Sequence, residues 1–510
     1  MSRFPTDLFA GSRFAVLGLG RNGAPAACAL ASMGAEVVAW DDDAATRAAF
    51  VGAAEVRDLA QGPFDFDALV LSPGIPHILP APHPVALKAR ATGIPILSDA
   101  ELLFQAVRRA GSRARFVGIT GTNGKSTTTA LLAHLLTTAG HQVAAGGNLG
   151  PASLALPLLG DDGIYVLEMS SYMLERLATL RFDVAAMLNI SADHLDRHAG
   201  MPGYLAAKRA VFDRQTGDDV AVVGVDDAES RTCAIWLRTH PARVVTVSGQ
   251  GIADVWCDRG ILRDADGPIV DMAQVAALPG THNAQDAAAA AAIGSALGSG
   301  PSCPRKRAFK RASKRAYTSP SDPSGGMDSR LRGNDEVARQ QLARQQLARQ
   351  QLTAAIRGFP GLPHRQQRVG CQDGIVFIND SKATNADAAA RALACYDRLV
   401  WIAGGLAKAG GIVPLAPYFP RIAHAVLIGR DAPVLAATLA AAGVSHTIAG
   451  TLEKAVPEAF TAARRTGSPV VLLSPACASF DQFSGFDARG ERFAALARTL
   501  AQSLAHEATA

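Results

Sequence analysis

Residues 118–127, Gly-Ile-Thr-Gly-Thr-Asn-Gly-Lys-Ser-Thr, have the residue types of a loop that binds phosphate groups. Small side chains let backbone N–H groups surround a chain of phosphates, Lys125 can reach the terminal phosphates, and Ser126 can hold Mg²⁺. The loop departs from the full Walker pattern, because Ile119 stands where that pattern has its first glycine. An apolar strand precedes it and a helical pattern follows, so we predict a nucleotide-phosphate site. Its members are Gly121, Thr122, Asn123, Gly124, Lys125, Ser126 and Thr127.

The next two predicted strands both end in residues that suit metal binding or acid–base chemistry. Glu168 ends a strand at 163–168, where open α/β sheets commonly place a functional carboxylate. A strand at 184–189 then runs into a segment that places His194 between two carboxylates. Each residue alone could be structural, but the cluster favours a functional site. Lys208 has the spacing of an ordinary lysine on a helix surface.

A second glycine turn lies near the N-terminus. Gly18, Gly20 and Gly23 follow an apolar strand, and Asp41 ends the next strand, as in a dinucleotide-binding fingerprint. A nicotinamide-dependent oxidoreductase would use this turn as its main cofactor site and would leave the loop at 118–127 unexplained. A purely structural turn is the other alternative.

The elements that position these residues predict an α/β fold with largely parallel sheets covered by helices. A strand at 14–17 runs into the first glycine turn, followed by a helix to about residue 33 and a strand at 36–40. A helical pattern also covers residues 83–91. Further apolar strands are predicted at 68–71, 116–119, 375–378, 398–403, 425–428 and 469–473.

These elements group into three predicted domains: residues 1–112, 113–360 and 361–510. Residues 299–350, inside the second, hold twelve Lys/Arg against four Asp/Glu, whereas the whole chain carries +5, so the remainder is slightly acidic. The segment ends in three Ala-Arg-Gln-Gln-Leu repeats, whose five-residue period keeps no apolar helix face. We predict a basic insertion, disordered to about residue 336 and with helical potential after it.

The charge distribution and the cysteines indicate the class of partner and compartment. The basic segment could tether nucleic acid or an anionic membrane, but its repeats suggest duplicated DNA, so neither partner is expected. The seven cysteines are scattered without CxxC spacing, which suits a reducing compartment and no zinc site. The N-terminus has no long apolar run, so we expect a cytoplasmic protein.

Eight segments resemble the Mur ligase family and occur in the order found there. The resemblance covers nearly the whole chain apart from residues 299–350, and the last two segments are most similar to the member that adds D-glutamate. The segments are GTNGKST, LEMSSYMLE, LNISADHLDRH, YLAAK, LPGTHN, GFPGLPHR, INDSKATN and SPACASFDQF.

The resemblance implies a three-domain enzyme. A Rossmann-like domain would bind the UDP-sugar, a central P-loop-type domain would bind ATP, and a Rossmann-like C-terminal domain would bind the amino acid. The implied reaction joins UDP-N-acetylmuramoyl-L-alanine to D-glutamate through an acyl phosphate and releases ADP and phosphate. The implied UDP-sugar residues are Gly18, Gly20, Gly23, Asp41, Ser72, Gly74 and Asn148. Beyond the phosphate loop, the implied ATP residues are Asn283, Asp286, Arg365 and Asp380.

The resemblance also implies roles at the reaction centre. Two Mg²⁺ ions are expected, held by Ser126, Glu168, His194 and Lys208, with Lys208 converted to a carbamate. The implied catalytic residues are Lys125, His194, Lys208 and Lys382. D-Glutamate would contact Thr384, Lys408, Ser479, Phe480 and Phe486.

The chain departs from the family pattern at three places, and two further functional classes stay open. Asp42 and Asp43 replace a frequent Thr-Arg pair, Asp286 replaces Asn, and Met173 replaces Gln. A relative that joins another amino acid would keep the ATP loop but differ in the last two segments. A non-catalytic nucleotide-binding scaffold would be expected to lose Glu168, His194 or Lys208, and all three are present. We expect a monomer.

Overall fold

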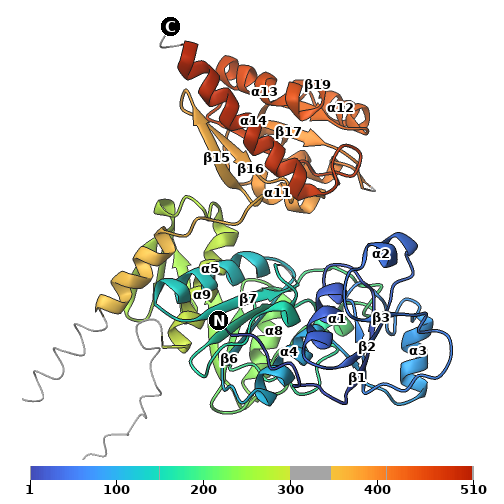
Figure 1. The fold of residues 1–510 in the computed structure, drawn as a ribbon. Coiled ribbons are helices and arrows are strands. Elements are labelled where there is room, and N and C mark those ends of the chain that lie inside the picture. The colour runs from blue at the N-terminus through green and yellow to red at the C-terminus, as the bar shows by residue number, and fades with distance from the viewer. Residues whose placement is uncertain (1, 149, 299–345, 409, 508–510) are drawn as a thin grey trace, which may run out of the picture. The chain divides into compact units, whose positions relative to one another are not determined.

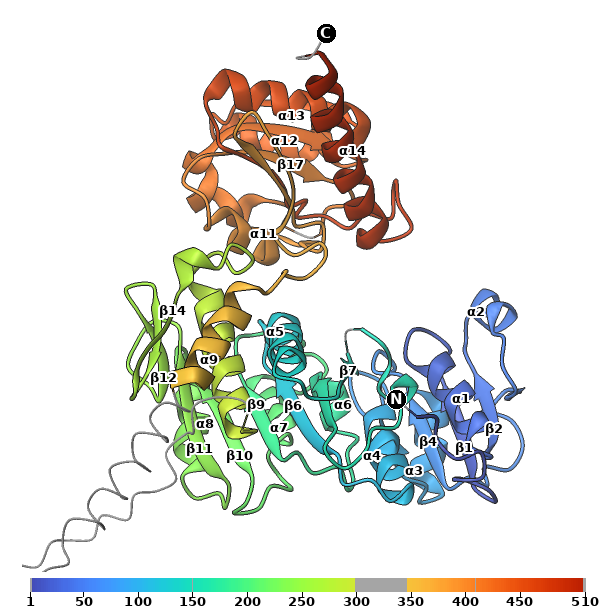
Figure 2. The same cartoon turned by 60° about the vertical axis from the view of Figure 1, so that its left-hand side comes forward.

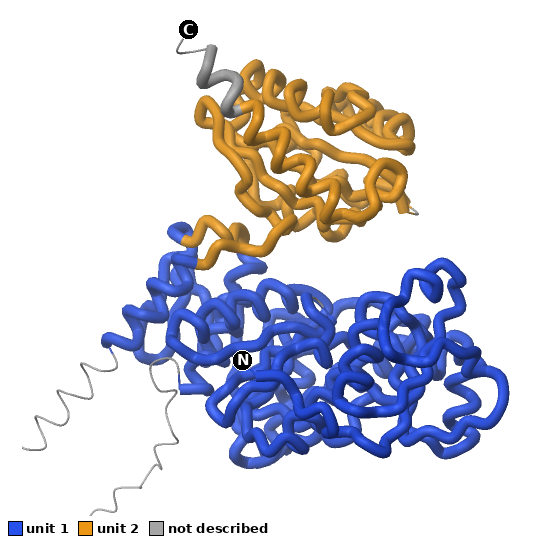
Figure 3. The backbone as a smooth tube through the Cα atoms, in the orientation of Figure 1, with its two compact units in different colours: residues 1–274, 281–358 blue, residues 275–280, 359–510 orange. Residues whose placement is uncertain are grey.

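The computed structural model describes residues 2–148, 150–298, 346–408 and 410–507. The chain forms two compact units (Figure 3). The first contains residues 1–274 and 281–358, and the second contains residues 275–280 and 359–510. No helix in the described ranges is long and apolar enough to cross a membrane.

The first unit begins with a five-stranded parallel sheet in the order β3-β2-β1-β4-β5 (Figure 1). Its central strands β1 and β4 are almost wholly apolar and buried, as expected for a parallel sheet covered on both faces. The strands are β1 (Arg13–Leu17), β2 (Glu36–Trp40), β3 (Glu55–Val56), β4 (Ala68–Leu71) and β5 (Ile96–Leu97). The helices are α1 (Gly23–Ser32), α2 (Ala44–Ala49), α3 (Pro84–Ala91) and α4 (Asp99–Arg109).

A nine-stranded sheet follows in the same unit, in the order β14-β13-β12-β11-β10-β9-β6-β8-β7. It is parallel from β7 to β12, and β12, β13 and β14 pair antiparallel. Its strands are β6 (Arg115–Thr120), β7 (Val143–Gly147), β8 (Ile164–Glu168), β9 (Val184–Met187), β10 (Val220–Gly224), β11 (Arg243–Ser248), β12 (Val255–Asp258), β13 (Ile261–Asp264) and β14 (Gly267–Asp271).

Helices cover this sheet (Figure 2), and most residues of α9 (Thr281–Ala296) are buried. Every residue of α9 from Asn283 to Gly294 is buried, mostly as alanine, against α5 and several strands. The small side chains let the helix backbone lie close to its neighbours. The other helices are α5 (Lys125–Thr138), α6 (Ser171–Leu174), α7 (Met201–Arg209) and α8 (Ala228–Leu237).

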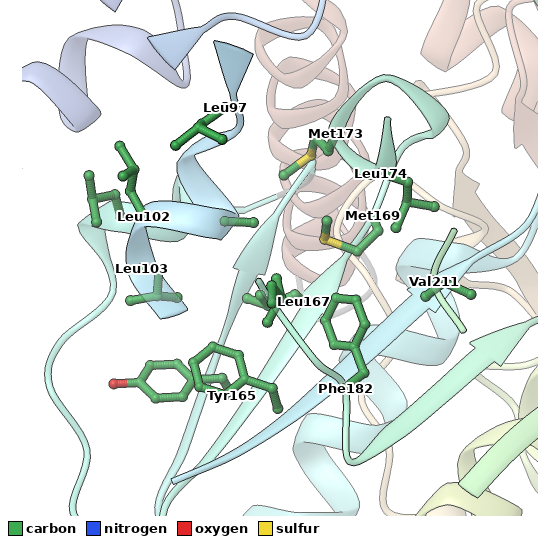
Figure 4. Close-up of a cluster of buried hydrophobic side chains, with 14 of the residues drawn as sticks. Leu97, Leu102, Leu103, Tyr165, Leu167, Met169, Met173, Leu174, Phe182 and Val211 are labelled. Atoms are coloured by element: carbon green, nitrogen blue, oxygen red, sulfur yellow. The ribbon is translucent and has the colours of Figure 1, made fainter. Parts of the chain in front are cut away.

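One apolar core joins the two sheets of the first unit. Figure 4 shows Leu97 of β5 and Leu103 of α4 near Leu167 and Phe182 of the central region. All of these side chains are at most 7% exposed. Because the core is continuous, the two sheets form one compact unit, and the functional boundary near residue 112 remains a prediction.

The second unit is built on a six-stranded sheet in the order β15-β16-β20-β17-β18-β19. All neighbours are parallel except β15 and β16. The strands are β15 (Gln367–Gln372), β16 (Ile375–Asn379), β17 (Leu399–Gly404), β18 (Ile422–Ile428), β19 (His446–Gly450) and β20 (Val470–Leu473). The α-helices are α11 (Ala386–Leu393), α12 (Ala432–Ala441), α13 (Leu452–Thr466) and α14 (Phe486–Glu507).

The predicted α/β class is confirmed, and every strand predicted from the sequence is present within two or three residues of its expected bounds. Strands β3, β5, β7, β10 to β15 and β19 were not predicted. Residues 299–345 of the predicted insertion lie outside the described residues. Residues 346–357 are helical. Arg349 forms an ion pair of 2.9 Å with Asp264, so the last residues of the predicted segment belong to the folded unit.

Candidate functional site

The predicted phosphate loop connects β6 to α5. Gly124 caps the helix with a left-handed φ of +81°, a conformation that favours glycine. A Cβ atom added to Gly124 would lie 2.0 Å from Oδ1 of Asp286, near the start of α9. The buried Asp286 is 2% exposed. The loop is therefore confined between the carboxyl end of the sheet and the first two turns of α9, where Asn283 is also buried.

Backbone and side-chain hydrogen bonds fix the shape of this loop. Nζ of Lys125 donates to the carbonyl oxygens of Gly121 at 3.0 Å and Thr122 at 2.8 Å. The Asn189 side chain, which follows β9, accepts from the Asn123 N–H at 2.9 Å and donates to its carbonyl at 3.2 Å. The start of α5 directs backbone N–H groups and its positive dipole end toward the loop, which suits an anion.

Glu168 lies at the carboxyl end of β8, the strand beside β6. It is 2% exposed, and its Oε1 accepts a hydrogen bond of 2.9 Å from Nδ2 of Asn148. Its Oε2 is buried and accepts no hydrogen bond from the described residues. A buried carboxylate oxygen without a donor is costly, and a divalent cation with oxygen ligands would satisfy it. The residues present therefore fit Mg²⁺ at this position.

Lys208 lies inside the site rather than on the helix surface that its spacing suggested. It is 2% exposed, and its Nζ donates to the Gly121 carbonyl at 2.7 Å. Burial and the neighbouring Lys125 ammonium hold the pKa of Lys208 well below its ordinary value. A lowered pKa increases the fraction of a lysine that is present as the neutral, nucleophilic amine. The surface-lysine prediction is wrong because α7 turns this side chain toward the phosphate loop.

His194 follows β9 on an exposed loop. Its side chain is 51% exposed, its φ is +51°, and its Nε2 lies 3.5 Å from Oδ2 of Asp193. Its ring centroid is 5.2 Å from that of Tyr172. In the described ranges no group of three His, Cys, Asp or Glu side chains could hold a metal ion.

A cavity of about 390 Å³ lies at the carboxyl end of the first sheet. Predicted residues Gly18, Gly20, Asp41, Ser72, Gly74 and Asn148 line it, together with Arg21, Asn22, Asp42, Pro73 and Ile75. Gly23 does not line it. A Cβ atom on Gly23 would lie 1.7 Å from the Gly18 carbonyl oxygen, so this glycine allows the close turn rather than direct contact with a ligand.

Asp41 shapes the glycine turn of this cavity. Its carboxylate accepts from the Leu19 N–H at 2.7 Å and from the Asp43 N–H at 2.9 Å. Asp42, at one of the departures from the family pattern, contacts Nε2 of His83 at 2.9 Å. Met173, at another departure, is buried in the core at 1% exposure. Asn148 both lines the cavity and bonds to Glu168, so the cavity adjoins the candidate metal site.

The remaining predicted ATP residues, Arg365 and Asp380, belong to the second unit. Asp380 is buried after β16, where its carboxylate accepts from the Ser474 hydroxyl at 2.8 Å and the Gln366 N–H at 3.2 Å. Burial raises the pKa of Asp380 to about 7. Nζ of Lys382 lies 5.3 Å from the ring centroid of Phe486, so these two predicted residues are neighbours.

The predicted amino-acid residues follow three neighbouring strands. Thr384 follows β16, Lys408 follows β17, and Ser479 and Phe480 follow β20, all at the carboxyl edge of the sheet. Leu406 and Ala478 form an antiparallel bridge with N–H···O distances of 2.8 and 2.9 Å, which joins the second and third of these loops. Ser479 is 2% exposed and Phe480 is 71% exposed. The edge can thus present an exposed aromatic ring and a lysine to a ligand.

Three residues that support the loops of the candidate site, in one unit or the other, were not identified from the sequence. Arg176 and Arg489 are both buried and bond to backbone carbonyls, and burial lowers the pKa of each to about 10. Asp431 accepts from the Ala407 N–H at 2.8 Å, next to Lys408. Arg176 contacts the Leu71 carbonyl across 105 positions and Asp431 contacts Ala407 across 24, so no local pattern marks these contacts.

Comparison with known proteins identifies the family. The Mur ligase middle domain matches residues 119–294, and the profile described as Mur ligase, glutamate ligase domain, matches residues 364–477. The chain is 44% identical to the UDP-N-acetylmuramoylalanine--D-glutamate ligase of Paramagnetospirillum magneticum, over 97% of this chain and 98% of that protein. It is 43% identical to the protein of the same name from Rhodospirillum rubrum, over 98% and 97%.

Solved structures show the same fold at lower identity. The UDP-N-acetylmuramate-alanine ligase MurC from Thermotoga maritima matches with a TM-score of 0.55 and 16% identity, over 96% of this chain and 99% of that one. The MurF ligase from Thermotoga maritima, solved in complex with ADP, matches with a TM-score of 0.52 and 15% identity, over 98% of each chain. On the near-complete match to the two curated relatives, the chain belongs to the Mur ligase family.

Proposed function

We propose that this protein is an ATP-dependent ligase that joins D-glutamate to UDP-N-acetylmuramoyl-L-alanine in peptidoglycan precursor synthesis. The observation that carries this proposal is the near-complete match, at 44% and 43% identity, to two relatives that bear the name of this ligase. The site is consistent with it, because a phosphate loop, the buried Glu168 and the cavity at Asn148 lie in one unit.

The reaction requires activation of a carboxylate, since an amine does not displace oxide from a carboxylate at neutral pH. The alanine carboxylate of the UDP-substrate attacks the terminal phosphorus of ATP, so an acyl phosphate forms and ADP leaves. The amine of D-glutamate then attacks the acyl carbon, and the tetrahedral intermediate collapses to the amide and phosphate. Lys125 stabilises the charge that develops on the transferred phosphoryl group. His194 and Lys382 position the reacting groups.

Ser126 and Glu168 would hold one Mg²⁺ at the phosphate loop, which supplies charge neutralisation for the phosphates. His194 and a carbamylated Lys208 would hold a second. The neutral Lys208 amine attacks CO₂, forms an N–C bond and releases one proton to solvent, so an ammonium is replaced by an oxygen ligand. Burial of Lys208 favours this modification because it lowers the pKa of the amine.

Separate groups of loop residues position the sugar nucleotide, ATP and D-glutamate. The UDP end of the sugar nucleotide occupies the cavity at Gly18, Gly20 and Asp41, with Asn148 directed toward the alanine carboxylate. Asn283, Asp286, Arg365 and Asp380 complete the ATP site. Thr384, Lys408, Ser479, Phe480 and Phe486 enclose D-glutamate, and Lys408 faces its side-chain carboxylate. We further propose a cytoplasmic monomer.

Phosphate release tests the reaction and the choice of amino acid together. The enzyme is incubated with ATP, Mg²⁺ and UDP-N-acetylmuramoyl-L-alanine, and each of D-glutamate, L-glutamate, D-aspartate and diaminopimelate is added in turn. D-Glutamate should give the largest kcat/KM by at least about a hundredfold. A larger value for another amino acid would contradict the assigned substrate but keep the ligase chemistry. No amino-acid-dependent phosphate release would contradict both.

A further inference from the structure

The loop at residues 72–75, which lines the UDP-sugar cavity, is held from the central region by a buried arginine. Arg176 follows α6 and is 2% exposed. Its guanidinium donates to the carbonyl oxygens of Leu71 at 2.8 Å, Ser72 at 3.1 Å and Ile75 at 2.7 Å. This arginine fixes both ends of the loop and leaves the carbonyl of Gly74 for another donor.

A second arginine reaches that remaining carbonyl. Nη1 of Arg197 donates to the Gly74 carbonyl at 3.0 Å. The same guanidinium lies over the ring of Tyr172, with Cζ 4.4 Å from the ring centroid. Arg197 therefore contacts the wall of the cavity and an aromatic ring that belongs to α6.

The Tyr172 ring is held on a rigid support and adjoins His194. It stacks on His198 with a centroid distance of 5.5 Å and an interplanar angle of 13°. His198 is fixed in turn, because its two ring nitrogens lie 3.0 Å from Oε1 of Glu175 and 2.9 Å from Oγ of Ser171. The ring of His194 lies 5.2 Å from that of Tyr172.

We propose that Arg197 is a positioning residue that couples occupancy of the UDP-sugar cavity to the placement of His194 at the reaction centre. The inference rests on the proposed function. Arg197 and His194 are three residues apart on one exposed loop and share Tyr172 as a neighbour. A shift of the Gly74 carbonyl therefore moves the Arg197 guanidinium. The guanidinium contacts the Tyr172 ring, and that ring contacts His194.

Electrostatics supports the same coupling. In the described part of the chain, the hydrogen bonds of both guanidinium groups go to neutral acceptors, so no bonded carboxylate neutralises their charges. These two cations beneath the 72–75 loop, with Arg21 in the lining, counter the carboxylates of Asp41 and Asp42 in the same lining and favour an anion such as the diphosphate of a UDP-sugar. Binding of that anion stabilises the existing contact between Arg197 and the Gly74 carbonyl and so fixes the loop that carries His194.

Two measurements separate the binding part of this proposal from the coupling part. UDP alone is titrated by calorimetry, and kcat and KM for the UDP-substrate are measured from ADP release at saturating ATP and D-glutamate. Arg197→Ala should weaken UDP binding about tenfold and lower kcat at least tenfold. Tyr172→Ala should lower kcat by a similar factor and leave UDP binding within about twofold of the parent, since only the aromatic link is lost.

The double variant and a conservative variant test the connection itself. Because both residues act through one path, Arg197→Ala combined with Tyr172→Ala should lower kcat no more than the larger single effect. Arg197→Lys keeps the charge but not the planar stacking group, so it should restore UDP binding and leave kcat low. Arg109, whose guanidinium lies 4.6 Å from the Phe9 ring in the same unit, is the matched control, and Arg109→Ala should change neither quantity.

The outcomes distinguish this inference from the proposed function. A parent enzyme that ligates D-glutamate, with an Arg197→Ala variant equal to it in UDP affinity and kcat, would overturn the coupling and leave the function standing. Independent, multiplicative losses of kcat in the double variant would also overturn it. A parent that binds UDP but forms no amide would overturn the proposed function and the coupling with it. If Arg197→Ala melts early, Arg197→Lys carries the test.

Discussion

Substitution of Gly124 by alanine should damage the phosphate loop far more than its backbone strain alone explains. The residue has a φ of +81°, and a non-glycine residue in such a conformation costs about 1–3 kcal/mol. The added Cβ would also lie 2.0 Å from Oδ1 of Asp286, so either the carboxylate or the loop must move. Overpacking of this kind adds about 1–3 kcal/mol. We expect a total of about 2–6 kcal/mol.

Gly140 provides a matched control at the other end of the same helix. It follows α5 with a φ of +87°, and no atom lies within 4 Å of its added Cβ. Gly140→Ala should therefore cost only the strain, about 1–3 kcal/mol, and should leave ATP turnover within a few-fold of the parent. Gly124→Ala should reduce turnover by at least about a hundredfold, since displacement of a catalytic loop by about 1 Å has that effect.

Tryptophan fluorescence in urea can measure the stability of the first unit separately. Of the four tryptophans, only Trp401 belongs to the second unit, so a Trp401→Phe background reports the first unit alone. ADP release in the unmodified background measures turnover. Adding Asp286→Ala to Gly124→Ala should recover part of the lost stability, because it removes the clashing carboxylate. Equal losses of stability and turnover for Gly124→Ala and Gly140→Ala would refute the steric argument.

Three further predictions concern separate parts of the chain. Lys208→Ala should lose ligase activity and regain part of it with millimolar acetate or formate, which can supply the oxygen ligand of the missing carbamate. Asp380→Asn should flatten the pH dependence of the second unit's stability. The folded carboxyl keeps its proton until about pH 7, whereas an unfolded one ionises near pH 4, so stability falls by up to about 4 kcal/mol as pH rises through this window. Replacing residues 299–345 with a short Gly/Ser linker should leave activity within a few-fold, since loop-closure entropy changes slowly with length. Extending the replacement to residue 350 removes Arg349 and its ion pair with Asp264, and should lower the melting temperature.

Each of these predictions has a contrary result. Absence of rescue, together with a mass spectrum that shows only unmodified lysine, would count against the carbamate. Denaturation of the second unit, followed through Trp401 between pH 4 and 7, should have a steeper pH dependence in the parent than in Asp380→Asn, and parallel curves would exclude Asp380 as the cause. Equal melting temperatures for the two linker variants would mean that Arg349 contributes nothing measurable.

The sequence predicts best those elements whose signal is local. The apolar run 68–71 and the strand 36–40 coincide with β4 and β2, because short buried parallel strands read as continuous apolar segments. The strands β12 to β14 contain four or five residues with mixed polarity, so neither a period of two nor an apolar run marks them. The phosphate loop is also a local signal, since its glycines, lysine and helix start are contiguous.

The parts of the site that depend on distant contacts could not be predicted in this way. Helical spacing cannot show that Lys208 turns toward Gly121, because that carbonyl is 87 positions earlier in the chain. Arg176 meets the Leu71 carbonyl across 105 positions. Only the family resemblance indicated that Lys208 lies beside the nucleotide loop. Neither the local sequence pattern nor the resemblance indicated the contacts of Arg176.

The alanine-rich helix α9 restricts the amino-acid substitutions that this enzyme can accept. Its residues from Ala287 to Ala292 are at most 3% exposed, so the helix has no face on which a larger side chain can be placed without overpacking. Asp286 reaches the phosphate loop because this helix approaches so closely. In a scan of all single substitutions, α9 should therefore tolerate little beyond Gly and Ser from Ala287 to Ala292. Selection on nucleotide binding would then preserve a stretch of the chain that carries almost no functional groups of its own.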